Sequence, residues 1–196
     1  GSSTQGKNAV AIGYQAGYIK QGQGAIAIGD SAGQTGQGQG AIAIGVNAGQ
    51  TGQGIDSIGI GVNAGQNNQK GNAVALGWGA GQNSQEIGAV AIGYQAGFTG
   101  QNQYAVSIGS EAGLSTQGTN AVAIGYQAGF TQQGEQSIAI GLQAGQYIQA
   151  SQAVAIGYQA GFTGQNQFGI AIGSEAGSGT QGTNAVAIGY QAGFTG

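Results

Sequence analysis

Apolar and polar residues follow a pattern that repeats every sixteen residues along the whole chain. Each unit contains a segment of the form Ala-(Val/Ile)-Ala-(Ile/Leu)-Gly, with small changes, as at 9–13 and 185–189. Large aliphatic residues and alanines alternate there, which is the period of a short β-strand. The closing glycine recurs from Gly13 to Gly189 without insertion or deletion. Because sixteen residues are too few for paired helices, the repeat predicts an all-β protein.

The segments between these strands carry the signals of tight corners. Ala-Gly follows three residues after each closing glycine, from 16–17 to 192–193, and a stretch rich in Gly, Gln, Thr and Asn comes next. Glycine allows a positive φ and close approach of two backbones. We therefore predict that each unit is one coil, formed by a strand, a corner, a second short strand and a return.

Stacking of these coils predicts a parallel β-solenoid, or β-roll, of twelve 16-residue coils. Residues 1–196 form a single uninterrupted solenoid in this interpretation, and we expect it to be a segment of a longer chain or fibre. At about 4.8 Å per coil, the rod is about 57 Å long.

Apolar residues on both faces of the first strand suggest two buried surfaces. Two aliphatic ladders run from Val10 to Val186 and from Ile12 to Ile188, and we expect them to supply the main buried surface. The alanine face is apolar as well, and strands buried on both faces need two covering layers. The pattern thus predicts close packing against another chain or another sheet.

One glutamine occurs at the same place in every unit. Stacked amides can bond to the coils above and below and to corner backbone, so we predict a structural ladder; a regular hydrogen-bonding surface is the functional alternative. The column consists of Gln5, Gln21, Gln37, Gln53, Gln69, Gln85, Gln101, Gln117, Gln133, Gln149, Gln165 and Gln181.

Aromatic residues occur as pairs four residues apart that flank Ala-Gly. From the sixth coil on, the pairs fall on alternate coils, and Trp78, Tyr104, Tyr147 and Phe168 stand apart. Alternation of large and small residues favours packing in a core or an interface, whereas a row of rings also suits contact with sugars or a partner surface. The candidate partner or glycan contacts are Tyr14, Tyr18, Tyr94, Phe98, Tyr126, Phe130, Tyr158, Phe162, Tyr190 and Phe194.

The composition leaves little chemistry for catalysis. The chain has no Cys and no His, which removes thiol nucleophiles and the commonest general base and metal ligand, so we expect no enzyme activity, no cofactor and no metal site. A net charge of −3 argues against nucleic acid. No apolar run approaches the roughly 18 residues of a membrane span, so we expect no membrane insertion of this segment.

Two features offer weaker functional signals. Glu111 and Glu175 are equivalent positions four coils apart, about 19 Å; this is too far for a glycosidase carboxylate pair, so we expect solvated surface charges.

Small polar residues share one column from Thr35 to Thr131. Such a column suggests ice binding, although turn chemistry explains it more simply.

The segment A-V-A-I-G-x-x-A at 9–16, 89–96, 121–128, 153–160 and 185–192 resembles the S-V-A-I-G-x-x-A head repeat of trimeric autotransporter adhesins (YadA-like heads). Similar repeats occur in phage and large-virus fibre proteins. The resemblance implies a left-handed β-roll, a homotrimer, and extracellular display on a cell or virion surface. The units here are uniformly sixteen residues long.

Together these features favour a structural or adhesive surface fibre segment without catalytic activity. Its expected partners are further copies of itself, as a homotrimer or an end-to-end filament, and a host surface protein or glycan. The alternative is a self-assembling extracellular filament subunit held by coil stacking. A solenoid that binds ice or polysaccharide through a flat face is a third hypothesis.

Overall fold

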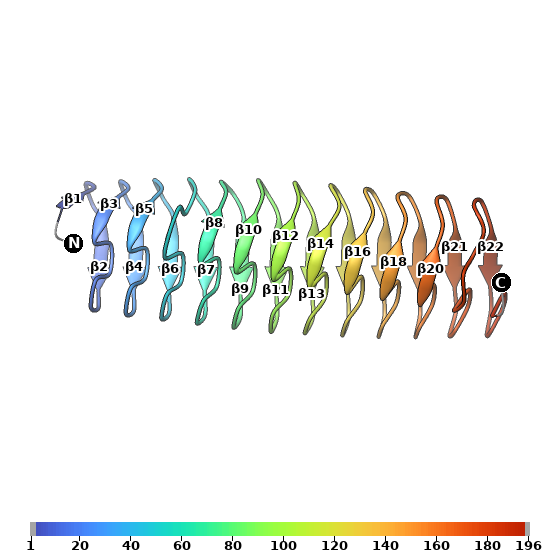
Figure 1. Ribbon diagram of the computed structural model, residues 1–196. Coiled ribbons are helices and arrows are strands. Elements are labelled where there is room, and N and C mark those ends of the chain that lie inside the picture. Colours follow the sequence, from blue (N-terminus) through green and yellow to red (C-terminus); the bar gives the residue numbers. More distant parts are fainter. Residues whose placement is uncertain (1–2, 195–196) are drawn as a thin grey trace.

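The computed structural model describes residues 3–194, which form one straight rod of stacked coils. The coils follow one another along the long axis, and the two ends of the chain lie at opposite ends of the rod (Figure 1). All described regular elements are β-strands of three residues, paired in parallel. The predicted all-β parallel solenoid with a sixteen-residue repeat is confirmed.

A twelve-stranded sheet, here called the aliphatic sheet, contains one strand from each coil. Every pair is shifted by sixteen residues, as in Val122↔Ile138 and Ile124↔Ile140. The strands are β2 (Val10–Ile12), β4 (Ile26–Ile28), β6 (Ile42–Ile44), β7 (Ile58–Ile60), β9 (Val74–Leu76), β11 (Val90–Ile92), β13 (Val106–Ile108), β15 (Val122–Ile124), β17 (Ile138–Ile140), β19 (Val154–Ile156), β21 (Ile170–Ile172) and β22 (Val186–Ile188).

On the opposite side of ten coils lies the predicted second strand, and these strands form the glutamine sheet, so named because each ends in the repeated glutamine. It consists of a three-stranded part and a seven-stranded part joined by single bridges at Thr51. The strands are β1 (Ser3–Gln5), β3 (Ile19–Gln21), β5 (Thr35–Gln37), β8 (Asn67–Gln69), β10 (Asn83–Gln85), β12 (Thr99–Gln101), β14 (Ser115–Gln117), β16 (Thr131–Gln133), β18 (Tyr147–Gln149) and β20 (Thr163–Gln165).

Two corners join the sheets. The alanine-glycine corner, such as 125–130, leads from the aliphatic sheet to the glutamine sheet, and the opposite corner, such as 118–120, leads back. Backbone bonds between coils continue through both corners: Gly129 N–H donates to the Ala144 carbonyl at 2.9 Å, and Asn120 N–H donates to the Gln103 carbonyl at 3.0 Å. Hydrogen bonds therefore fix the spacing of the coils around most of their contour.

The interior is made of small residues and glutamine, which corrects the expectation that the Val and Ile ladders form the main buried surface. Ala123, Ala128 and their equivalents are fully buried. A Cβ added to Gly129 would lie 3.2 Å from the Ala123 Cβ and 2.6 Å from Gln133 Oε1. The coil is thus too narrow for larger side chains, and the aliphatic residues point outward.

Candidate interaction surfaces

The glutamine column lies inside the coil and holds it together. Gln101 Nε2 donates to the carbonyls of Val90 and Ala105 at 2.8 and 3.1 Å, and to Gln117 Oε1 in the next coil at 3.1 Å. The same coil-to-coil amide bond runs from Gln37 to Gln181, broken by no coil. The amides are buried from Gln21 to Gln181, and only Gln5 is exposed. This burial leaves them unable to bind an external partner.

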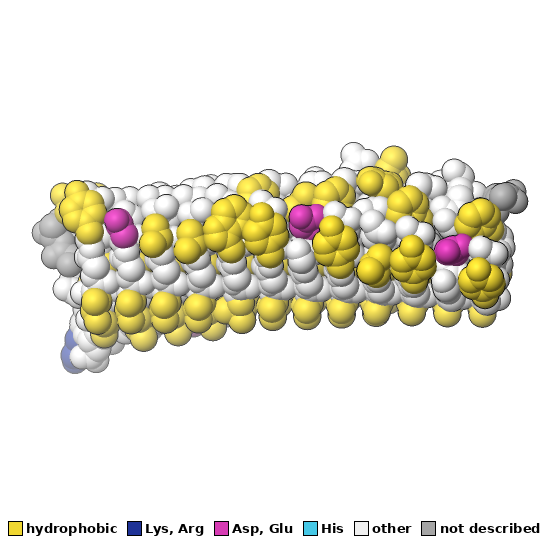
Figure 2. Space-filling model, turned by 90° about the horizontal axis from the view of Figure 1, so that it is seen from below, with side chains coloured by type: hydrophobic (Ala, Val, Ile, Leu, Met, Phe, Trp, Pro, Cys, Tyr) yellow, Lys and Arg dark blue, Asp and Glu magenta, His cyan; other side chains and the backbone are white. Residues whose placement is uncertain are grey.

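The outer face of the aliphatic sheet is an apolar surface without interruption. In the central coils Val122 and Ile124 are half-buried by their neighbours along the ladder, while at the end of the rod Ile188 is 64% exposed. Figure 2 shows a continuous row of hydrophobic side chains that follows the length of the rod. Contiguous apolar patches of this kind mark interaction sites, so this face is the best candidate for contact between chains.

The alanine-glycine corner carries the predicted aromatic contacts. Two columns point outward at this corner, one on each side. The first holds the tyrosines, and the second holds the Tyr or Phe found four residues later in the chain. Tyr94, Tyr126 and Tyr158 are 45–49% exposed, whereas Phe98, Phe130 and Phe162 are half-buried. Tyr14, Tyr18, Tyr190 and Phe194 are exposed near the ends of the described rod. The structure therefore brings the candidate residues onto one edge of the molecule.

Two ring contacts are recorded in the described chain. Trp78 stacks on Tyr94 at a centroid distance of 5.1 Å, and Tyr147 meets Phe162 edge-on at 5.4 Å. Trp78 belongs to the same column as the corner tyrosines, one coil before Tyr94. The sequence pattern did not include Trp78 and Tyr147 in the aromatic pairs. The sixteen-residue spacing between Trp78 and Tyr94 nevertheless predicts that these two rings lie in adjacent coils.

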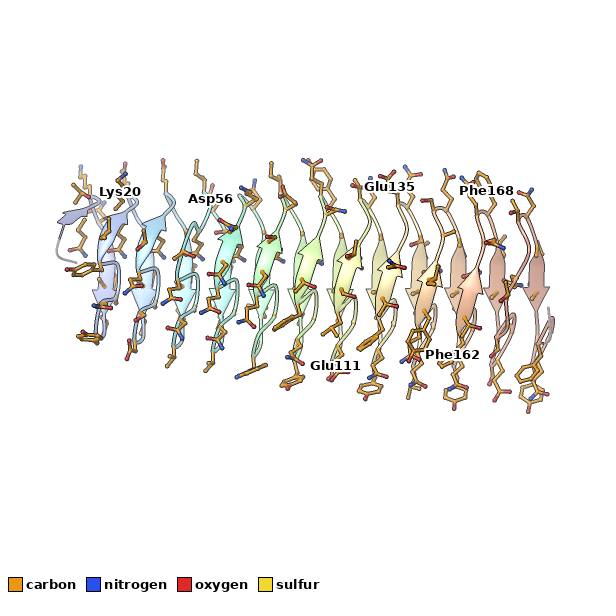
Figure 3. All side chains as sticks on the ribbon, viewed as in Figure 1. Lys20, Asp56, Glu111, Glu135, Phe162 and Phe168 are labelled. Atoms are coloured by element: carbon orange, nitrogen blue, oxygen red, sulfur yellow. The ribbon has the colours of Figure 1, made fainter. Side chains whose placement is uncertain are left out.

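The two repeated glutamates are partly exposed members of a polar ladder on the same corner. Glu111 Oε2 accepts a hydrogen bond from Gln127 Nε2 at 2.7 Å, and Glu175 Oε2 accepts one from Gln191 at 2.7 Å. Figure 3 places Glu111 and Phe162 at one edge of the rod and Asp56, Glu135 and Phe168 toward the other. The acidic groups are therefore spread over both corners.

The small polar column engages its own neighbours. Thr51 Oγ1 donates to Asn67 Oδ1 at 3.0 Å, and Asn67 Nδ2 donates to Asn83 Oδ1 at 3.0 Å. Thr163 donates to the Ser178 carbonyl. These side chains satisfy one another along the glutamine sheet, so the column offers little support for an ice-ordering surface.

No pocket is found within residues 3–194, and that part of the chain contains no group of three or more acidic, His or Cys residues that could hold a metal ion. It also contains no helix long and apolar enough to cross a bilayer. What the described chain offers to other molecules is therefore its outer surface: a flat aliphatic face, an aromatic corner and polar ladders.

These features define a β-solenoid repeat protein whose outward faces, not its interior, are available for contact. Three segments, residues 1–16, 116–129 and 181–192, match the family model of the YadA head domain repeat. Over these parts the chain consists of YadA head domain repeats, the repeats of trimeric autotransporter adhesin heads. No curated protein and no solved structure matches the chain.

The matched family has known general properties. YadA-like adhesins are homotrimers, their heads imply a bacterial cell surface, and the family is generally non-enzymatic. The predicted resemblance, which rested on the A-V-A-I-G-x-x-A segments, is confirmed for the matched parts.

Proposed function

We propose that this chain is a non-catalytic segment of a bacterial adhesin head, a rigid rod that holds binding surfaces away from the cell. The observation that carries the proposal is the uninterrupted aliphatic face of a coil whose core is already complete without it. A rod that remains a monomer would expose this apolar face to water. A chain that packs against copies of itself buries it.

We infer that three copies pack through their aliphatic sheets, since YadA-like adhesins are homotrimers. The outward Val and Ile side chains from β2 to β22 supply one apolar face per chain. Threefold cyclic symmetry brings the three faces together around one axis, so that none stays exposed to solvent. The glutamine sheets and both corners then remain on the outside. Repeated surface features along the rod gain avidity because many weak contacts act together.

Surface display tests the adhesive role. The chain is anchored on a non-adherent laboratory bacterium, and attachment to cultured epithelial cells is counted against the bare strain and against a strain that displays an unrelated β-solenoid at equal density. We expect saturable attachment that soluble chain inhibits. Attachment at the level of the unrelated solenoid would exclude an adhesive role and leave a purely structural one.

A further inference from the structure

We propose that the alanine-glycine corner of coils six to twelve binds an extended, neutral polysaccharide chain. The site is called the tyrosine strip. It consists of Tyr94, Tyr126, Tyr158 and Tyr190 and of the side-chain amides and carboxylates in the neighbouring column, which runs from Gln95 to Gln191. The inference rests on the proposed adhesive role and deepens it by naming a class of ligand.

The spacing of the rings keeps their surfaces available. Where rings occupy adjacent coils, as Trp78 and Tyr94 do, they stack on each other at 5.1 Å. From Tyr94 on, rings return only in every second coil, about 10 Å apart at about 4.8 Å per coil. Ser110 and Ser174 occupy two of the intervening positions. The third, between Tyr126 and Tyr158, is Leu142. Rings at this distance cannot stack on one another, so Tyr126, Tyr158 and Tyr190 keep ring surface for a partner, whereas Tyr94 shares one face with Trp78.

Backbone hydrogen bonds hold the backbone positions of the tyrosines in a fixed row. The Tyr94 carbonyl accepts the Glu111 N–H at 2.8 Å, and the Tyr158 carbonyl accepts the Glu175 N–H at 2.7 Å. The Tyr126 carbonyl accepts an N–H from the next coil in the same way, at 2.9 Å. A ligand that lies on this row does not have to order the backbone, because the spacing of the tyrosine positions is set before binding.

A row of amides runs beside the rings. Gln143 Nε2 donates to Gln127 Oε1 at 3.1 Å, and Gln159 Nε2 donates to Gln143 Oε1 at 3.0 Å. Gln127 Oε1 also accepts a hydrogen bond from Gln146 Nε2 at 2.8 Å. Each amide has two N–H donors and two lone pairs, so Gln127 keeps one N–H, and Gln143 and Gln159 keep both donor and acceptor capacity. Glu111 likewise uses one oxygen in its bond to Gln127. Donors and acceptors thus alternate along the edge of an aromatic row.

This combination matches the surface of a neutral sugar. A sugar ring presents C–H groups that pack on aromatic rings and hydroxyls that both donate and accept hydrogen bonds. Acidic glycans fit poorly because the strip contains carboxylates, and the lysines of the chain, Lys7, Lys20 and Lys70, occupy other columns. The ligand is extended, because the described surface has no pocket and its rings lie in line.

A contact with a second copy of the chain is the competing explanation for exposed rings. The strip suits that role less well than the aliphatic sheet, because an interface here would have to bury the Glu111 and Glu175 carboxylates, and burial of a charge without a counter-charge is costly. Figure 2 shows acidic side chains among the larger hydrophobic side chains of the corner, beside a continuous hydrophobic row.

Native electrophoresis in polysaccharide-containing gels tests the proposal, since the chain carries a net charge of −3 and migrates toward the anode. The gels contain hydroxyethyl cellulose, galactomannan or no polysaccharide. The strip variant is Tyr94→Ser, Tyr126→Ser and Tyr158→Ser, which copies the serine of positions 110 and 174. The control variant is Tyr104→Asn and Phe168→Asn on the opposite corner, where Asn72, Asn120 and Asn184 occupy the same column.

We expect at least one of the two polysaccharides to retard the unmodified chain and the control variant equally, and the strip variant to migrate as in the gel without polysaccharide. Equal migration of the unmodified chain in all gels would overturn the proposal, and so would retardation of the strip variant. A strip variant with a lower sedimentation mass would also overturn it, because the tyrosines would then be assembly contacts. Cell attachment by the displayed chain tests the adhesive role separately.

Discussion

The buried glutamines show how a polar residue can serve as core. Gln101 fills space beside Ala105 and satisfies the Val90 carbonyl while it receives an amide bond from Gln85. An apolar side chain of similar size leaves these buried groups without partners, and each such group costs free energy. The repeated glutamine thus fills the coil and satisfies its backbone at the same time.

Replacement of Gln101 by leucine is expected to lower the free energy of unfolding by about 1–3 kcal/mol, because the Val90 carbonyl and the Gln85 amide lose a partner inside the coil. The matched control is Gln103→Leu, two residues further on and exposed, for which a change within about 0.5 kcal/mol is expected. Chemical denaturation followed by circular dichroism measures both. Equal effects of the two changes would argue against a structural role of the ladder.

Ile148 occupies a backbone conformation that suits it poorly. Its φ is 50°, in the left-handed region, and its side chain is exposed. A β-branched residue there is strained by about 1–2 kcal/mol, and Gly and Asn take the same column elsewhere, as at Asn68. We expect Ile148→Asn to raise the midpoint of denaturation and the reverse change, Asn68→Ile, to lower it. A lower midpoint for Ile148→Asn would show that the isoleucine makes a stabilising contact.

At the scale of elements, the sequence determined the strands and the coil but not which face of the strand is inside. Ala123 and its neighbours Val122 and Ile124 are all apolar, so alternation alone assigns no direction. The width of the coil decides it, because the contacts around Gly129 leave room only for alanine and glutamine. That width results from the corners, where Gly or Asn often occupies the left-handed position, as at Asn72 and Asn120, whereas Tyr104 and Phe168 adopt the same conformation without that sequence signal.

The glycine that ends each aliphatic strand permits the close stacking of corners. Gly125 has a φ of 128°, and a Cβ there would lie 2.5 Å from the Gly141 carbonyl oxygen of the next coil. Gly125→Ala therefore adds a steric clash to the backbone strain and is expected to destabilise the rod by more than about 3 kcal/mol. The control is Gly24→Ala, with a φ of 67° and no atom within 4 Å, which adds strain alone, about 1–2 kcal/mol. Thermal denaturation separates the two, and a similar loss at both positions would contradict the close stacking.

At the scale of the whole molecule, the candidate aromatic contacts were predictable as a column but their availability was not. From the sequence, Tyr94 and Phe98 are equally good candidates for contact with a partner. In the structure the tyrosine is exposed and the phenylalanine is half-buried. The outward direction of the aliphatic sheet has the larger consequence. It leaves one complete apolar face on a coil whose interior is already filled by alanine and glutamine.

Charge placed on that face should prevent association. We expect Val122→Lys with Ile124→Lys to reduce the sedimentation mass of the protein, because burial of two ammonium groups in an apolar interface is costly. The control, Thr131→Lys with Gln132→Lys on the glutamine sheet, adds the same charge to a face that stays outside the proposed trimer. A loss of assembly in the control variant instead would locate the interface on the glutamine sheet.

Sedimentation equilibrium of the unmodified protein over a wide concentration range tests the central claim most directly. A homotrimer closed through the aliphatic sheets predicts a single species of three times the chain mass of 19.0 kDa, with no growth at high concentration. A stable species of one chain mass would contradict the claim that this face is an interface between copies. Species that lengthen with concentration would contradict the closed trimer in favour of a filament.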